Sequence, residues 1–113
     1  MTKIKLFKSD NMFTGFEVSG HSGYADYGKD IVCASISSIV QSCALGIIKV
    51  LSINAKLDKD DNRGFLKLES PKNLSKELMD KTQLLIKTMQ LSIEDLLTGY
   101  SKYIKMEVIE NVY

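Results

Sequence analysis

The residues best suited to chemistry gather in one segment, residues 20–35, with the sequence GHSGYADYGKDIVCAS. His21 is the only histidine in the 113 residues, and Cys33 is one of two cysteines. When a thiol and an imidazole meet, the imidazole stabilises the thiolate as an ion pair and can later donate its proton to a leaving group. These residue types predict nucleophilic thiol chemistry, with Cys33 as nucleophile and His21 as base.

The elements around this segment decide whether the two side chains can meet. Strand-like residues over 3–8 and 12–19, separated by Ser-Asp-Asn, predict a β-hairpin. A helical apolar pattern follows over residues 31–51 and includes Val32, Ile36, Ile39, Val40, Cys43, Ile47 and Val50. His21 then falls just after the second strand, while Cys33 falls in the first helical turn, inside the apolar arc. Because such a strand end and helix start commonly lie at one edge of a layered domain, we expect the thiol to face His21.

Asp30 is a favoured N-cap residue and would place Cys33 at the third helical position. A thiol there meets unpaired backbone N–H groups and the positive end of the helix dipole, which both favour thiolate. The same N–H groups offer a site for an oxyanion. The residue types also allow a plainer interpretation, in which Asp30 only caps the helix, Cys33 is a small buried hydrophobe and His21 a surface residue.

The rest of the chain predicts two short strands, a long helix and a final strand, at residues 54–57, 64–68, 74–97 and 103–109. Gly99 is expected to close the long helix. The charged stretch LDKDDNRG is interpreted as a hairpin turn, because Arg63 stands where a calcium-binding EF-hand loop requires glycine. The order ββαββαβ predicts an α/β fold, a two-layer sandwich with two helices packed on one face of a mixed sheet, in a single domain over residues 1–113.

Composition narrows the possible functions. Lys and Arg number 15 against 14 Asp and Glu, a balance that gives no footprint for nucleic acid or a membrane surface. We expect no apolar run long enough to span a bilayer. The start of the chain lacks the apolar core of a signal peptide, so free thiols in a cytoplasmic protein are expected. Cys33 and Cys43 would lie about 15 Å apart along one helix, too far for a disulfide or a shared zinc ion, and no metal or cofactor is predicted.

The run GHSGYADYGKDIVCASIS, residues 20–37, resembles the signature of the ribosomal-processing cysteine proteases of Firmicutes and related bacteria, the Prp family. The shared pattern is a Gly-His pair, a loop with a glycine, and then Asp-Ile-Val-Cys-Ala. The likeness extends over nearly the whole chain in length and element order. In that family the cysteine is the nucleophile and the histidine its base, which map onto Cys33 and His21, and the aspartate maps onto Asp30. Ser22 and Ser35 stand where alanine is expected more often, a difference that bears on fine substrate preference.

The resemblance implies a cysteine endopeptidase that removes the N-terminal extension of large-subunit ribosomal protein twenty-seven. It also implies a homodimer. The candidate substrate contacts are Gly20, Ser22, Gly23, Tyr24, Tyr27, Gly28 and Ser37. For the two tyrosines, packing within the loop is the alternative.

Two other functions remain open from the sequence. One is a noncatalytic, ribosome-associated dimeric binding protein. The other is a redox sensor in which Cys33 is oxidised rather than acylated. Peptide cleavage that is lost when Cys33 is replaced would separate the protease from both.

Overall fold

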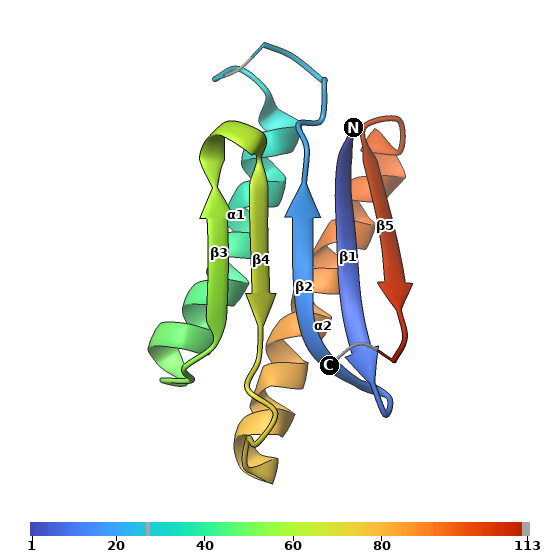
Figure 1. The fold of residues 1–113 in the computed structure, drawn as a ribbon. Helices are drawn as coiled ribbons and strands as arrows, with labels where there is room; N and C mark the ends of the chain where they lie inside the picture. The colour runs from blue at the N-terminus through green and yellow to red at the C-terminus, as the bar shows by residue number, and fades with distance from the viewer. Residues whose placement is uncertain (27, 112–113) are drawn as a thin grey trace.

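The computed structural model describes residues 1–26 and 28–111, which form a five-stranded sheet with two helices on one side (Figure 1). In chain order the elements are β1 Thr2–Ser9, β2 Met12–Ser19, α1 Ile31–Leu45, the π-helical turn η1 Gly46–Val50, β3 Lys56–Asp60, the 3-10 turn η2 Asp61–Arg63, β4 Phe65–Glu69, α2 Lys76–Tyr100 and β5 Ile104–Ile109. The predicted order ββαββαβ and the α/β fold class are confirmed.

The sheet is mixed, as predicted, with strand order β3-β4-β2-β1-β5. β1 pairs antiparallel with β2 and parallel with β5. The β1–β2 hairpin turns through Asp10 and Asn11, whose φ angles of 51° and 67° are ones that Asp and Asn tolerate better than most residues. At the upper end of Figure 1, the end of β2, the start of α1 and the β3–β4 turn come together. The two elements that flank residues 20–30, β2 and α1, therefore lie at the same edge of the molecule as the β3–β4 turn.

The core lies between the sheet and the helices. Its fully buried strand residues include Ile4, Leu6, Phe16 and Leu68. The helical run of residues 31–50 adds Val32, Ile36, Val40, Cys43, Ala44 and Ile47. Val50, expected on the same arc, is 80 % exposed. The π-helical turn explains this difference, because its wider winding changes the angular spacing of the side chains from that of an α-helix.

The run Ile31–Val50 is apolar enough, by length and composition alone, to cross a membrane. This corrects the expectation that no such run exists in the chain. A core helix passes the same test, and this run packs its buried residues against the sheet. Its apolar character therefore has a structural use within the fold.

The second half of the chain departs from prediction at two places. β3 runs from Lys56 to Asp60, so the strand includes residues expected in the turn, and only η2 and Gly64 reverse the chain. α2 continues through Gly99 to Tyr100, so the prediction that Gly99 closes this helix is wrong. The helix instead ends at Tyr100 with Ser101 as its C-cap, and the Tyr103 N–H donates to the Tyr100 carbonyl in the turn toward β5.

We expect opposite effects of alanine at two glycines. A Cβ at Gly15 would lie 2.2 Å from the Leu68 carbonyl oxygen of the neighbouring strand, so Gly15→Ala should destabilise the protein by about 2 kcal/mol. A Cβ at Gly99 meets no atom within 4 Å, and Gly99→Ala should add roughly 0.5 kcal/mol through helix propensity. Urea unfolding monitored by circular dichroism measures both. Equal stability of the two variants would contradict this assignment.

Candidate active site

A cleft of about 740 Å³ opens where β2 ends, α1 begins and the β3–β4 hairpin turns. Six of the residues singled out in the sequence line it, namely Gly20, His21, Gly28, Asp30, Cys33 and Ser37. The expectation that the end of β2 and the start of α1 lie at one edge is therefore confirmed. His21 and Cys33 therefore border the same cleft.

The carboxylate of Asp30 accepts hydrogen bonds from both segments that form this site. Its Oδ1 accepts a hydrogen bond from the Cys33 N–H at 2.9 Å, which confirms the predicted N-cap. Its Oδ2 accepts from the Ser22 hydroxyl at 2.5 Å and from the N–H groups of Tyr24 and Ala25 at 3.1 and 3.3 Å. One carboxylate thus ties the loop after β2 to the first turn of α1.

The pKa of Asp30 reflects this network. Burial alone would raise it, but the hydrogen bonds from Ser22, Cys33 and Ala25 outweigh burial and lower the pKa from 3.8 to about 2. The carboxylate is therefore charged at all physiological pH values. A charged Asp30 cannot serve as a general acid there, which favours a structural role.

The Cys33 thiol sits against Ser22, the residue that follows His21. The Ser22 N–H donates to Cys33 Sγ at 3.1 Å, and the thiol contacts Ser22 Oγ at 3.4 Å. This N–H donor fixes the position of the sulfur beside the end of β2. The predicted use of first-turn N–H groups for an oxyanion needs correction at one position, because the Cys33 N–H is already bound to Asp30.

His21 is exposed at the cleft and contacts a segment that the sequence did not connect with it. Its Nε2 lies 3.2 Å from the Asn62 carbonyl oxygen in η2. Gly64 packs close by, since a Cβ there would lie 3.1 Å from His21 Cε1. The β3–β4 turn is therefore part of the surroundings of the imidazole.

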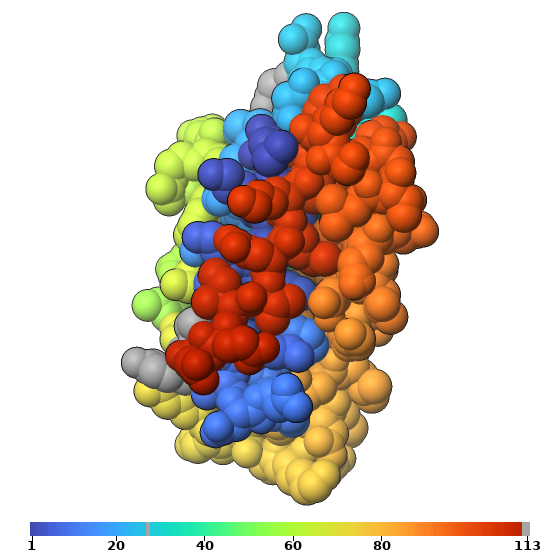
Figure 2. Space-filling model, turned by 90° about the vertical axis from the view of Figure 1, so that its right-hand side faces the viewer, coloured from blue at the N-terminus to red at the C-terminus, as the bar shows by residue number. Residues whose placement is uncertain are grey.

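Some of the residues that the sequence predicts to contact substrate do not line the cleft. The ring of Tyr24 packs edge-on against Tyr100 and Tyr103, with centroid distances of 5.7 and 5.3 Å. Figure 2 shows the end of α2 and the chain after it close to the loop that follows β2. The packing alternative therefore accounts for Tyr24, which does not line the cleft.

Two further residues that the sequence predicts to contact substrate also lie outside the cleft. Ser22 is buried, and Gly23 has φ 77°. Tyr27 lies outside the described residues.

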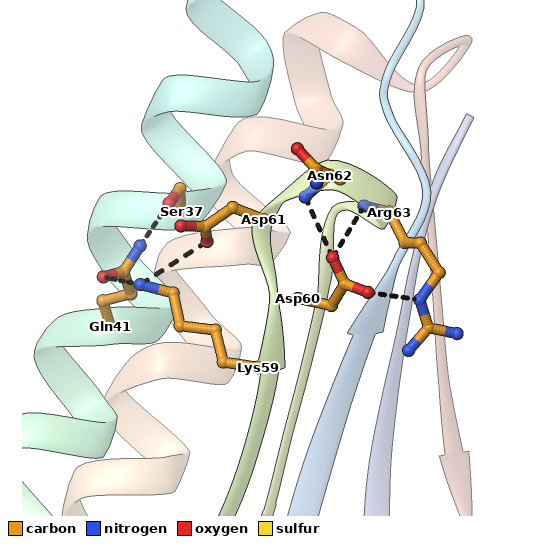
Figure 3. Close-up of polar contacts among 7 residues, drawn as sticks. All are labelled: Ser37, Gln41, Lys59, Asp60, Asp61, Asn62 and Arg63. Carbon is orange, nitrogen blue, oxygen red and sulfur yellow. Dashed lines mark hydrogen bonds and ion pairs between the residues drawn. The ribbon is translucent and has the colours of Figure 1, made fainter.

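A series of side-chain hydrogen bonds, which the sequence does not predict, connects α1 with β3. Gln41 donates through Nε2 to the Ser37 hydroxyl at 2.6 Å and accepts through Oε1 from Lys59 at 3.2 Å. Lys59 also lies 3.5 Å from Asp61 (Figure 3). All four residues line the cleft. In the sequence, Lys59 and Asp61 belong to a charged run, which by itself gives no signal beyond a solvated turn.

The second cysteine has a different environment. Cys43 is buried in the core, and burial raises the pKa of its thiol to about 12. Both cysteines are free. Within residues 1–26 and 28–111, no three His, Cys, Asp or Glu side chains gather as a metal ion would require.

The fold and the site define a class, α/β proteins with a cleft that a cysteine lines at the start of a helix. A family model for the cysteine protease Prp matches residues 1–105. The ribosomal processing cysteine protease Prp of Bacillus subtilis is 30% identical over 97 residues, which cover 86% of this chain and 87% of that protein. This chain therefore belongs to the Prp family of ribosomal processing cysteine proteases.

Two solved structures of the Staphylococcus aureus protease Prp share the fold. The complex with a covalently linked product peptide has a TM-score of 0.83 and 27% identity, and the complex with a substrate peptide has a TM-score of 0.79 and 25% identity. Each comparison covers 96% of this chain and 99% of the other. In both structures the S. aureus protease holds a peptide.

We expect selective alkylation of one cysteine. Iodoacetamide at neutral pH should modify Cys33 in the folded protein and leave Cys43 unmodified, because Cys43 is buried and its pKa of about 12 keeps the thiol protonated. Peptide mass mapping identifies the labelled residue, and labelling in urea provides the control in which both cysteines react. Label on Cys43 in the folded protein would contradict this assignment.

The low pKa of Asp30 predicts an acid-sensitive contribution to stability. Above the unfolded-state pKa of about 3.9, the contribution is fully present. It is lost as the pH falls through the folded-state pKa of about 2, because the unfolded chain takes up the proton first. The difference in free energy of unfolding between wild type and Asp30→Asn should therefore shrink as the pH falls from about 5 to about 2, a range that includes both pKa values.

Urea unfolding at a series of pH values measures this difference. Asp58→Asn, which removes an exposed carboxylate in β3, is the matched control and should follow wild type throughout. A difference between wild type and Asp30→Asn that stays constant with pH would contradict the prediction.

Proposed function

We propose that this protein is a cysteine endopeptidase that removes the N-terminal extension of large-subunit ribosomal protein twenty-seven, with Cys33 as nucleophile and His21 as base. The observation that carries the proposal is the 3.1 Å hydrogen bond from the Ser22 N–H to Cys33 Sγ, on a cleft that His21 also lines. The substrate peptide and the covalently linked product peptide bound by the S. aureus protease support the same chemistry here.

The reaction follows from these groups. The Cys33 thiolate attacks the scissile carbonyl carbon, and a C–S bond forms as the C–N bond breaks. The His21 imidazolium gives its proton to the leaving amine. Water, deprotonated by His21, then attacks the thioester, which releases the carboxylate product and returns sulfur as the thiolate. The two steps together consume one water and produce one amine and one acid.

The residues that line the cleft suit a peptide substrate. The apolar ones come from the sheet and from α1, namely Val18, Ile36, Val40, Phe65 and Leu66. Ser37, Lys59 and Asp61 add polar groups to the lining. Such a mixture allows apolar side chains of a substrate to be buried while its backbone finds hydrogen-bonding partners.

The proposal includes a cytoplasmic homodimer. Two free thiols suit a reducing compartment. Large apolar side chains on the outer surfaces of both helices support self-association, since Leu45, Leu84 and Leu91 are each more than half exposed. Light scattering of the purified protein measures the oligomeric state.

The direct test is incubation with the unprocessed ribosomal protein from the same organism. Mass spectrometry should show one cut near its N-terminus. Cys33→Ala should lower the rate by on the order of 10⁴-fold or more, because the nucleophile is gone. His21→Ala should lower it by roughly 10²- to 10⁴-fold. Cleavage by a folded Cys33→Ala protein at the wild-type rate would rule out the nucleophile.

Cys43→Ala is the matched control for the loss of a thiol. It should cleave normally and lose about 1 kcal/mol of stability, because it leaves a small defect in the core. No cleavage by the wild type, together with reversible oxidation of Cys33, would instead favour the redox sensor. No cleavage together with binding to ribosomes would favour the noncatalytic binding protein.

A further inference from the structure

A lysine of β3 contacts a glutamine of α1 where both elements line the cleft. Lys59 Nζ lies 3.2 Å from Gln41 Oε1, and Gln41 Nε2 lies 2.6 Å from the Ser37 hydroxyl oxygen (Figure 3). Asp61 lies 3.5 Å from the same ammonium group. Three cleft residues from two elements are thus joined in one series of hydrogen bonds, from Lys59 through Gln41 to Ser37.

The ammonium group at one end gives this series its direction. Because an ammonium group can only donate, the side-chain atom that it contacts must be an acceptor, and the carbonyl oxygen of the Gln41 amide faces Lys59. The amide nitrogen of Gln41 then faces Ser37 and donates to its hydroxyl oxygen. Lys59 therefore determines which way round the Gln41 amide lies.

The Ser37 hydroxyl keeps a proton to donate. A hydroxyl that accepts from Gln41 turns its own proton away from that donor. Ser35 and Thr88 donate theirs to the helix carbonyl four residues earlier, but Ser37 makes no such bond in the part of the chain that the structure describes. Cys33 precedes Ser37 by four residues, on the same face of α1. The series thus ends in a hydroxyl donor that borders the cleft one helical turn from the thiol.

We propose that Gln41 and Lys59 are positioning residues, which direct the Ser37 hydroxyl proton toward a peptide bound in the cleft. The acceptor is a backbone carbonyl oxygen of that peptide, because an extended chain offers one at every residue. This positioning role rests on the proposed function only in that the cleft binds a peptide, since no step of the cleavage enters it.

Gln41→Glu tests the direction of the series without changing the size of the side chain. A carboxylate can only accept, so it keeps the contact with Lys59 and also takes the Ser37 proton for itself. The bound peptide then loses one hydrogen bond, and we expect its affinity to fall roughly threefold to tenfold. A bridge that merely held α1 to β3 would survive this change, because the lysine and the carboxylate still pair.

Calorimetry measures the affinity of the Cys33→Ala protein, which cannot cut, for a synthetic peptide. The peptide covers the N-terminal extension of the ribosomal protein and the first residues after it. Because Gln41→Glu also adds a charge to the cleft, the same change is made in Ser37→Ala, where there is no hydroxyl proton to divert. The loss of affinity in that background reports charge alone, and the larger loss with Ser37 present reports the hydrogen bond.

Two further sets of variants complete the experiment. Gln90→Glu is the matched control, because Gln90 also accepts from a lysine at 3.2 Å, Lys87 on α2, and this change should leave the affinity unaltered. Lys59→Met removes the donor that orients the Gln41 amide, so it should weaken binding of the peptide. Lys59→Arg should restore binding, because arginine also only donates.

The results separate this positioning role from the proposed function. An equal effect of Gln41→Glu with and without Ser37 overturns the role, even where the wild type cleaves the ribosomal protein. A loss that requires Ser37 supports it, and if the wild type then cleaves nothing, the protease is refuted while the peptide site stands. If Gln41→Glu does not fold, equal affinities of Lys59→Met and Lys59→Arg overturn the role. A peptide that does not bind the Cys33→Ala protein at all overturns both proposals.

Discussion

The site depends on one carboxylate that is surrounded by donors. Asp30 holds the first turn of α1 through the Cys33 N–H and the loop after β2 through Ser22, Tyr24 and Ala25. Because the Ser22 N–H in turn points at Cys33 Sγ, the cap also sets the position of the thiol's own donor. A charge that accepts this many hydrogen bonds is costly to neutralise, and without it the N–H groups of Cys33 and Ala25 would lose the acceptor that holds them. The aspartate next to the Ile-Val-Cys motif is thus a fixed anion that positions the Cys33 thiol.

The opposite side of the cleft is built differently. β3 is exposed along most of its length, so few apolar contacts hold the outer edge of the sheet. Polar contacts replace them, with Lys59 reaching Gln41 of α1 and Asp60 capping the turn that meets His21. Isolated exposed pairs of this kind contribute little stability. Their value here is geometric, because they join a helix, a hairpin and the imidazole around one cavity.

The predictable parts of this fold are those with a local cause. Strand alternation located the first hairpin, and the capping preference of Asp30 located the start of α1. Val50 differs from the prediction because a π-helical turn breaks the angular spacing that the prediction assumes. α2 runs one residue past Gly99, to Tyr100, whose ring packs against Tyr24 from a distant part of the chain. The contact between Asn62 and His21 had no local signal at all, since a backbone carbonyl has no residue type and the two segments meet only through the sheet order.

The sheet order also has a consequence for how the chain acquires its shape. β1 lies between β2 and β5, and its register with β5 pairs Thr2 with Ile104. The first and last strands of the described residues therefore pair, which gives the protein many contacts between distant parts of the chain. Folding is slow when loop closure must precede such pairings. Thr2 also lines the cleft and holds the Gly20 carbonyl through its hydroxyl at 3.4 Å. Thr2 in turn donates its N–H to the Tyr103 carbonyl at 2.9 Å, so a segment that follows Cys33 by 70 residues supports this side of the cavity. A chain that stops short of Tyr103 would carry Cys33 without this support.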